Sequence, residues 1–485
     1  MFINIYAVAK MLGPSLLALA VAAMIPFCYA LVNDTSGALS FGVMILATLV
    51  LSQFLSYVGT KRTKESLSIR ELFLFTTSLW VMVALLAAIP INTMLPELNY
   101  ANAVFESASA LSTTGATTIS QLETKPAAML LWRSILQMLG GIGFVVIAVA
   151  VLPQAATGGM NIFRTESTSF EDRNKFTPHL KTMSMAILGY YIAVFILCTA
   201  AYIIGGMDFF MAINASMCTV ATGGMMPLDA SMNGFSPFVH YSAAFFMFIC
   251  SCPFAVVVAG IAGNIHKAWI DQQMRGYFIF TLLASAVITA TLMFYNGYDL
   301  EHAWRVSIFN ITSILSTSGF ALEDFTQWNP VATLIFFFIL PLGGCSGSTS
   351  GGMKFFRLQV AASLFKTQLI KSLHPHRVIE PYFNRHVVDA ATMHSIITYF
   401  AAYIIVVIVS SLICTMGGLN IIDAISATVT CLSNVGPAIG PELNPSANFA
   451  GLHWGIQLIF AFDMLLGRLE IIPVLLLMTR FFWRT

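Results

Sequence analysis

Four short polar tracts carry the residues of this chain whose types and spacing suit ion binding. They read STTGA at 112–116, VATGG at 220–224, STSGF at 316–320 and SNVGP at 433–437, and we call them tracts one to four. Apolar segments flank each tract. The tracts lie roughly 100 residues apart, which is too far for a solenoid repeat. Four such units in one chain indicate a pseudo-fourfold ring.

A ring of four glycine-centred loops has a definite chemistry. Backbone carbonyl oxygens replace the hydration shell of a cation, and glycine allows backbone angles that a side chain would obstruct. One such glycine alone is explained equally well as the cap of a buried helix, but four in register favour a filter. The residues that we expect to bind the ion are Thr113, Thr114, Gly115, Ala221, Thr222, Gly223, Thr317, Ser318, Gly319, Asn434, Val435 and Gly436.

A second polar segment interrupts an apolar run in the third unit. The run 330–342 is too short to cross a bilayer core of about 30 Å, yet the sequence GGCSGSTSGG follows at 343–352. Such backbone is tolerated at membrane depth only beside water or other protein, so we place it in a cavity below the filter. The phosphate-binding spacing GxxxxGK[ST] is absent, which argues against a nucleotide site.

Arg468 lies inside the last apolar segment, near Asp463 and Glu470. A charge within a membrane helix usually faces a cavity or a partner. We therefore expect Arg468 in the pore, acting with loop 343–352 as an electrostatic barrier. The alternative is that the helix ends early and that Arg468 extends to the membrane interface.

The elements that position these residues are membrane helices. The chain is 58% hydrophobic and 9% charged, a composition typical of integral membrane proteins. Apolar segments at 11–32 and 38–58 precede tract one. The spans expected in the four units lie near 71–95, 127–152, 183–206, 237–263, 277–296, 330–360, 390–416 and 448–479.

The predicted fold is all-α, with two N-terminal helices and four helix, pore loop, helix repeats around one pore. It has ten spanning helices and four half-crossing pore helices. The expected boundaries are 1–60 for the N-terminal helices, 61–160, 161–270 and 271–375 for repeats one to three, and 376–485 for repeat four. Loop 343–352 belongs to repeat three.

Each half-crossing helix begins with residues that stabilise a helix N-terminus. These are Asn102, Asp208, Asp299 with Glu301, and Asn420 with Asp423. The C-termini then point into the membrane, where four partial negative charges favour a cation at their centre.

Charge asymmetry sets the expected orientation. Basic residues gather at 61–70, 164–181, 267–275 and 354–385, and the alternate loops are acidic. The basic loops are expected to be cytoplasmic, which puts the tracts on the outer side. Lys10, Arg480 and Arg484 place both termini in the cytoplasm.

With one glycine in each of four pore loops, the chain resembles the Trk/Ktr/HKT superfamily of potassium transporters. Its two additional N-terminal helices are similar to the TrkH/TrkG branch. Gly224 beside Gly223 and Pro437 after Gly436 depart from the simplest pattern.

The resemblance implies potassium uptake across the bacterial inner membrane, and Gly115 implies a preference for potassium over sodium. It also implies a gate formed by Gly343, Gly344, Gly347, Ser348, Gly351, Gly352 and Arg468. The implied partners are a cytoplasmic nucleotide-binding subunit similar to TrkA and a second copy of the chain. We further expect contact with membrane lipid and potassium as the transported ion. No bound cofactor and no nucleic-acid partner are expected.

Three other functions are weaker. A symporter that carries potassium or sodium coupled to another cation, a proton or sodium, stays open, although the sequence shows no carboxylate relay within the membrane. A membrane enzyme would need a nucleophile with a partnered base or clustered carboxylates, and no such pattern is visible. A carrier with inverted repeats conflicts with four units that share one orientation.

Overall fold

The computed structural model describes residues 3–33, 35–60, 67–151, 176–261, 263, 265–445 and 447–484. Within these residues, six helices are long and apolar enough to cross a membrane, and a bent pair adds a seventh candidate span. The basic clusters at 61–64 and 164–175 and the expected repeat boundary at 160/161 lie outside the described residues.

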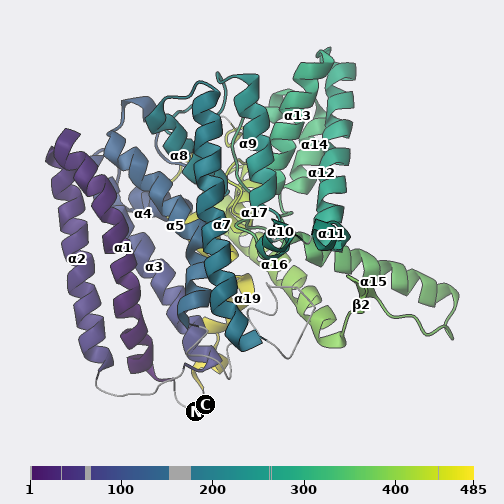
Figure 1. The fold of residues 1–485 in the computed structure, drawn as a ribbon, viewed down its shortest axis with the longest axis horizontal. Coiled ribbons are helices and arrows are strands. Elements are labelled where there is room, and N and C mark those ends of the chain that lie inside the picture. Colours follow the sequence, from purple (N-terminus) through teal and green to yellow (C-terminus); the bar gives the residue numbers. More distant parts are fainter. Residues whose placement is uncertain are drawn as a thin grey trace.

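The helices run in four similar groups after an N-terminal pair (Figure 1). The pair is α1 (Ile5–Asn33) and α2 (Thr35–Gly59). The remaining helices are α3 (Ile69–Met94), α4 (Tyr100–Leu111), α5 (Ala127–Val151), α7 (Phe176–Ile204), α8 (Phe209–Val220), α9 (Pro237–Cys250), α10 (Phe254–Ile261), α11 (Ile265–Ile270), α12 (Gln272–Thr291), α13 (Leu300–Leu315), α14 (Pro330–Ile339), α15 (Phe355–Leu373), α16 (Ala390–Met416), α17 (Ile421–Ser433), α18 (Trp454–Arg468), α19 (Ile471–Leu477) and α20 (Arg480–Trp483).

Helices α1 and α2 form an antiparallel pair at one edge of the molecule (Figure 1). Gly13 lets the two backbones approach, since a Cβ there would collide with Ser56 of α2. The hydroxyl of Ser52 donates to the carbonyl oxygen of Gly13 (2.7 Å). Small residues with a side-chain hydrogen bond are a usual way for membrane helices to pack.

Two spans that were expected to be continuous are broken, which corrects the sequence interpretation, and a third is interrupted as expected. The span 237–263 divides into α9 and α10, bent by 104°, with Pro253 at the break. The span 330–360 shows the expected interruption, since loop 343–352 lies between α14 and α15. The span 448–479 divides at Leu469 and Glu470, and Glu470 has a positive φ of 62°. Hydropathy is averaged over a segment of many residues, so it does not detect one or two residues whose backbone is not helical.

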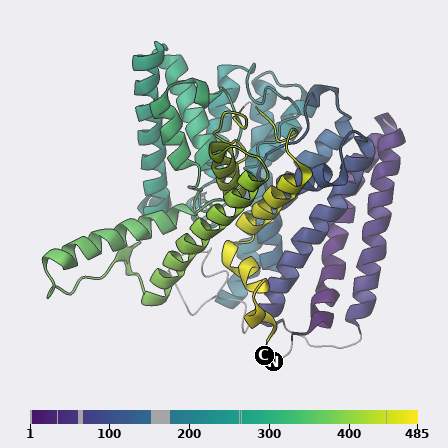
Figure 2. The same ribbon diagram turned by 180° about the vertical axis from the view of Figure 1, so that it is seen from behind.

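The region after α14 departs from a purely helical fold. Helix α15 extends sideways from the helical body together with a short hairpin (Figure 2). Strands β1 (Tyr382–Phe383) and β2 (His386–Val387) pair in antiparallel register. Asn384 and Arg385 both have positive φ, as a two-residue hairpin turn requires. This hairpin corrects the all-α prediction.

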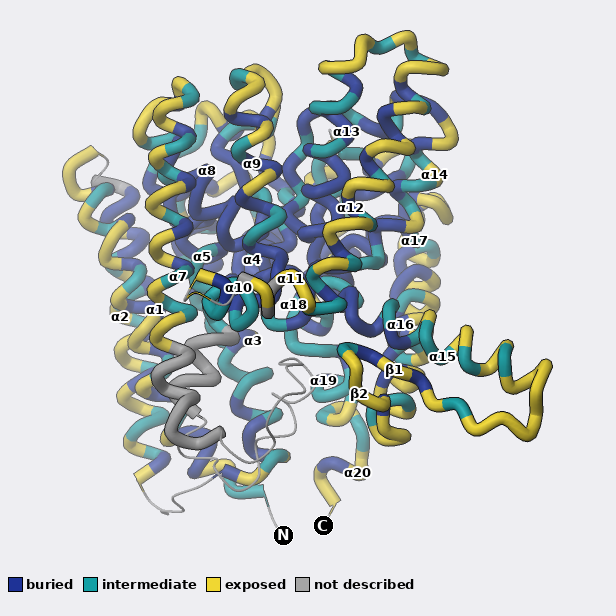
Figure 3. Tube along the Cα trace, turned by 45° about the vertical axis from the view of Figure 1, so that its right-hand side comes forward, coloured by how far each residue is buried: buried dark blue, intermediate teal, exposed yellow. Residues whose placement is uncertain are grey.

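The surface and the surroundings of the tracts differ from those of a water-soluble protein, whereas most of the buried side chains are apolar as usual. Along α16, the apolar residues Ile397, Ile404 and Ile408 are each more than half exposed. Many serine and threonine residues are fully buried around the tracts, near the centre of the molecule (Figure 3). This pattern suits a protein that has lipid around it and a polar region at its centre.

Candidate functional site

Four short helices, α4, α8, α13 and α17, lead into the four tracts. Each begins with a side chain that accepts a hydrogen bond from a backbone N–H of the first turn. These capping residues are Asn99, Asp208, Asp299 and Asn420. In α4 the cap is Asn99 and not the expected Asn102, whose own N–H donates to Asn99 (2.9 Å). The caps fix the N-termini, so the negative ends of the helix dipoles meet the tracts.

All four helices end in the same turn. The N–H groups of Thr114, Gly223, Ser318 and Val435 donate to carbonyl oxygens five residues earlier, at 2.8–3.0 Å. The preceding residues are left-handed, with φ of 57° at Thr113, 54° at Thr222, 57° at Thr317 and 57° at Asn434. This pattern is a Schellman ending, which usually places glycine at the left-handed position. Here three threonines and an asparagine occupy it.

The glycines follow two residues later. Gly115, Gly224, Gly319 and Gly436 have φ between 72° and 103°. In tract two this backbone position therefore belongs to Gly224, one residue later than the expected Gly223. Gly223 instead matches Thr114, Ser318 and Val435. Two adjacent glycines hid this register in the sequence, because either one satisfies the pattern.

The four tracts touch one another in a closed cycle. A Cβ on Gly115 would collide with the carbonyl oxygen of Gly223, and one on Gly224 with that of Ser318. A Cβ on Gly319 would collide with the carbonyl oxygen of Val435, and one on Gly436 with that of Thr114. The same backbone group meets the same glycine position at all four contacts. The arrangement is therefore a pseudo-fourfold ring in which each glycine leaves room for the next tract's carbonyl.

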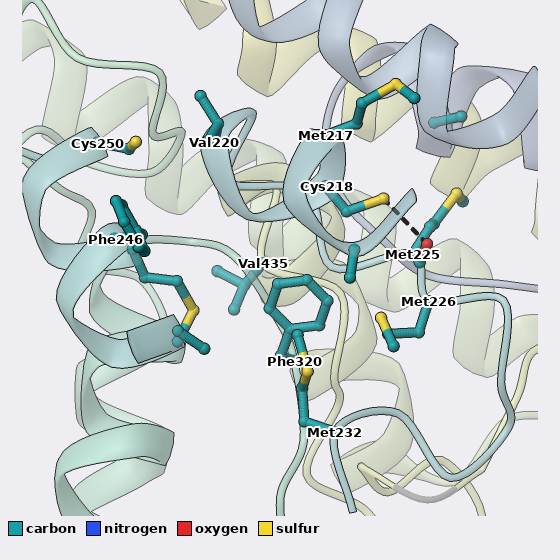
Figure 4. Close-up of a cluster of buried hydrophobic side chains, with 14 of the residues drawn as sticks. Met217, Cys218, Val220, Met225, Met226, Met232, Phe246, Cys250, Phe320 and Val435 are labelled. Atoms are coloured by element: carbon teal, nitrogen blue, oxygen red, sulfur yellow. Dashed lines mark hydrogen bonds between the residues drawn. The ribbon is translucent and has the colours of Figure 1, made fainter. Parts of the chain in front are cut away.

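Apolar side chains from tracts two, three and four pack together with neighbouring residues in one buried cluster (Figure 4). Met225, Met226, Phe320 and Val435 are buried there, and Cys218 donates its S–H to the carbonyl oxygen of Met225 (3.0 Å). Thioethers and aromatic rings fill an irregular space of this kind without polar atoms that need partners. The polar groups of the tracts bond within their own repeat, as between the hydroxyls of Ser112 and Thr114 (2.7 Å), and also to other tracts and to the loop described next.

Loop 343–352 contacts the left-handed residues of three tracts. The N–H of Gly351 donates to the hydroxyl of Thr317 (2.7 Å), and the hydroxyl of Thr222 donates to that of Thr349 (3.2 Å). A Cβ on Gly351 would lie 2.8 Å from the Cβ of Asn434. The loop therefore lies directly against the ends of the short helices.

The break between α9 and α10 supports the other side of this loop. Cys345 donates its N–H to the carbonyl oxygen of Ser251 (2.8 Å), and Phe254 donates its N–H to that of Gly347 (3.0 Å). The glycines Gly343, Gly344 and Gly352 allow the loop to fold on itself, since a Cβ on each would meet other atoms of the loop. Gly347 and Gly352 also have positive φ, and Ser348 donates to the carbonyl oxygen of Cys345 (2.6 Å).

Arg468 connects this loop to α5. Its guanidinium donates to the carbonyl oxygens of Thr349 (2.7 Å) and Gly140 (2.8 Å). Arg468 is the last residue of α18, so the helix does end early, but the side chain reaches the loop. Of the two neighbouring acids, Glu470 forms an ion pair with Arg357 (2.7 Å). The other, Asp463, accepts from Ser410 (2.9 Å).

A buried ion pair behind tract one was missed by the sequence interpretation. Glu106 of α4 and Arg133 of α5 lie 3.2 Å apart, with 0% and 2% of their side chains exposed. Glu106 also accepts from the hydroxyl of Thr117 (2.7 Å) and from the N–H of Thr118. Opposite charges in two neighbouring apolar helices were the available signal.

A cavity of about 400 Å³ lies near the start of α4 and is lined in part by Glu97, Thr118 and Lys125. Lys125 donates to Glu97 (2.8 Å), and this hydrogen bond lowers the pKa of Glu97 from its usual value. Within the described part of the chain, no group of three His, Cys, Asp or Glu side chains could hold a metal ion.

Comparisons with known proteins agree on one family. The TrkH family profile, described as a cation transport protein, matches residues 41–484. The chain is 34% identical to the Trk system potassium uptake protein TrkI of Halomonas elongata, over 98% of this chain and 96% of that protein. It is 30% identical to TrkH of Escherichia coli K12, over 99% of both. The crystal structure of the potassium transporter TrkH from Vibrio parahaemolyticus matches with a TM-score of 0.89, at 28% identity, over 99% of this chain and 100% of that one.

Proposed function

Because the chain belongs to the TrkH family of cation transport proteins, we propose that it takes up potassium through a pore at the centre of the four tracts. It is a multi-pass membrane protein of a transporter family and not an enzyme. The relatives named above are potassium uptake proteins. Potassium is therefore the proposed transported ion, and no cofactor is proposed.

The observation that carries the proposal is the closed cycle of glycine and carbonyl contacts. Thr114, Gly223, Ser318 and Val435 each present a carbonyl oxygen to the glycine of a neighbouring tract. In the proposed filter, this layer and the oxygens next to it replace the water around potassium. The C-termini of four short helices add partial negative charge of about half an electron each, which stabilises a cation.

The proposed fold counts each broken helix as one span. On that count two N-terminal helices and eight spans enclose four half-crossing helices, as the four similar helix groups suggest. The proposed boundaries remain 1–60, 61–160, 161–270, 271–375 and 376–485.

Loop 343–352 and Arg468 form the proposed gate. The loop contacts Thr222, Thr317 and Asn434 at the ends of the short helices, which would close the path below the filter. Arg468 attaches the loop to Gly140 and adds positive charge to the same place. Opening then requires that the loop leave these contacts.

The proposed setting is the bacterial inner membrane, with the tracts facing outward and both termini in the cytoplasm. The described ends support this, because α1 begins and α20 ends at the same end of the molecule (Figure 2). A nucleotide-binding regulatory subunit on the cytoplasmic side and a second copy of the chain are the proposed partners.

Ion flux into liposomes that contain the purified protein tests the proposal. In liposomes loaded with potassium, the outward potassium gradient generates a potential that is negative inside. We expect this potential to drive an uptake of tracer rubidium that exceeds the uptake of tracer sodium and that needs no proton gradient. Uptake that stops when the proton gradient is removed would favour a coupled symporter instead. No potassium flux with folded protein would overturn the proposal.

A further inference from the structure

Gln137 of α5 makes two hydrogen bonds to the backbone of tract two. It is fully buried, its amide Nε2 donates to the carbonyl oxygen of Gly223, and its Oε1 accepts from the N–H of Met225 (3.3 Å). We infer that Gln137 is a positioning residue that determines ion preference by fixing the backbone around Gly224. The inference rests on the proposed function, because it assigns a role within the proposed filter.

The two partners determine the orientation of the amide. The carbonyl oxygen of Gly223 only accepts, and the N–H of Met225 only donates. A single primary amide satisfies both groups at once. A carboxylate would lose the donor, and an apolar side chain would leave both backbone groups without this partner.

Gln137 also fills a space that belongs to a side chain in the other tracts. Thr114, Ser318 and Val435 occupy the position that Gly223 occupies in tract two. A Cβ on Gly223 would lie 2.5–2.7 Å from the amide atoms of Gln137. The amide of Gln137 therefore occupies the space where tract two lacks a side chain, so that residues 137 and 223 are complementary in shape.

The corresponding helix of repeat four has no amide at the matching position. Gly140 of α5 and Gly467 of α18 correspond, since a Cβ on each would collide with a carbonyl oxygen at the end of its own short helix, that of Leu111 or Leu432. Three residues before Gly467 lies Met464, which is buried in an apolar cluster with Ala116 of tract one. The amide that α5 places against tract two is therefore replaced on α18 by a methionine.

The position of the Gly223 carbonyl matters to two tracts. It is the oxygen that a Cβ on Gly115 would meet, so it closes the junction between tracts one and two. Without Gln137, the pair Gly223–Gly224 has no side chain to restrict it and glycine samples many backbone angles. A filter with one mobile carbonyl discriminates less well between potassium and sodium.

The test measures the potassium-to-sodium permeability ratio in liposomes for four variants. Gln137→Met, which copies Met464, should lower the ratio several-fold. Gly223→Ser should also lower it, because the new side chain collides with Gln137. The double variant Gln137→Ala with Gly223→Ser reads Thr-Ser-Gly in tract two, as tract three does, and should recover a ratio above that of either Gln137→Met or Gly223→Ser.

Gln457→Leu is the matched control. Gln457 is also a fully buried glutamine, but it donates to Phe449 outside the tracts (3.0 Å), so its loss should leave the ratio unchanged. An unchanged ratio in folded Gln137→Met, or a double variant whose ratio does not exceed those of both single variants, would overturn the inference. Wild-type protein without potassium flux would instead refute the proposed function.

Discussion

At the scale of single residues, the proposed filter and the proposed gate meet at strained positions. Thr113, Thr222 and Thr317 are β-branched and yet left-handed, a conformation that costs on the order of 1–3 kcal/mol. The hydroxyls of Thr222 and Thr317 bind loop 343–352. Glycine would remove the strain but also the hydroxyl. The strain thus accompanies the contact between the proposed filter and the proposed gate.

Gly115→Ser should lower the preference for potassium over sodium. The position has a φ of 88°, and a Cβ there collides with the carbonyl oxygen of Gly223, so the new side chain displaces a proposed ligand. The permeability ratio in liposomes measures the effect. Gly234→Ser is the matched control, because its φ is 94° but no atom lies within 4 Å of a Cβ there. Equal ratios in both variants would remove Gly115 from the filter.

Arg468→Ala should raise basal potassium flux several-fold. The substitution removes two charge-assisted hydrogen bonds, each worth about 1.5–3 kcal/mol, that attach Thr349 and Gly140 to each other through the guanidinium. Arg468→Lys keeps the charge but lacks the planar fork that reaches both carbonyl oxygens, so its flux should be intermediate. If folded Arg468→Ala conducts like the parent or less, the residue has a structural role and the barrier hypothesis is wrong.

At the scale of elements, broken helices rather than whole ones build the proposed gate. The breaks in α9/α10 and α14/α15 face each other, and backbone hydrogen bonds from Cys345 and Phe254 join them. Free N–H and C=O groups at a break need partners inside a membrane. Here each break supplies the hydrogen-bond partners of the other. The two breaks can therefore separate only if their backbone groups find new partners.

Removal of residues 347–350 should raise basal potassium flux without changing the permeability ratio. The deletion eliminates the contact between Thr349 and Thr222, whereas the cycle of glycines in the tracts remains. Flux in liposomes without any added partner protein is the measurement. Shortening of the exposed turn at 374–377 serves as a control for the loss of loop residues. Wild-type flux in the folded deletion variant would identify the loop as a connector only.

At the scale of the whole molecule, the ring is the point where all four repeats meet. No repeat completes it alone, because each glycine requires the carbonyl of a neighbouring tract. The buried pair Glu106–Arg133 and the bridging Gln137 add support that differs from one repeat to another. The ring is therefore pseudo-symmetric in its backbone and asymmetric in its side-chain support.

Potassium should raise the melting temperature of the detergent-purified protein more than sodium or choline does. A ligand that binds only the folded state stabilises it by about 2.7 kcal/mol at roughly 100 times its dissociation constant. Because four repeats share the site, the gain should appear in the main unfolding transition. The shift should shrink in Gly115→Ser. Equal shifts with potassium and choline at the same ionic strength would contradict a selective site.

The sequence by itself determined the membrane class, the four tracts and the polar loop. These depend on local properties, namely hydropathy, glycine and helix-start residues, which act within a few residues of the chain. The starts of α8, α13 and α17 at Asp208, Asp299 and Asn420 followed from the same local signals. The assignment to the Trk superfamily was confirmed by the family match over residues 41–484.

Only the tertiary structure decided how these parts fit together. The register of tract two at Gly224, the partners of Arg468 and the bridging role of Gln137 depend on contacts between residues far apart in the chain. So do the helix breaks, because a break persists only where another segment satisfies its free backbone groups. Such contacts leave no periodic or compositional trace, since each is fixed by the three-dimensional packing of segments that lie far apart in the chain.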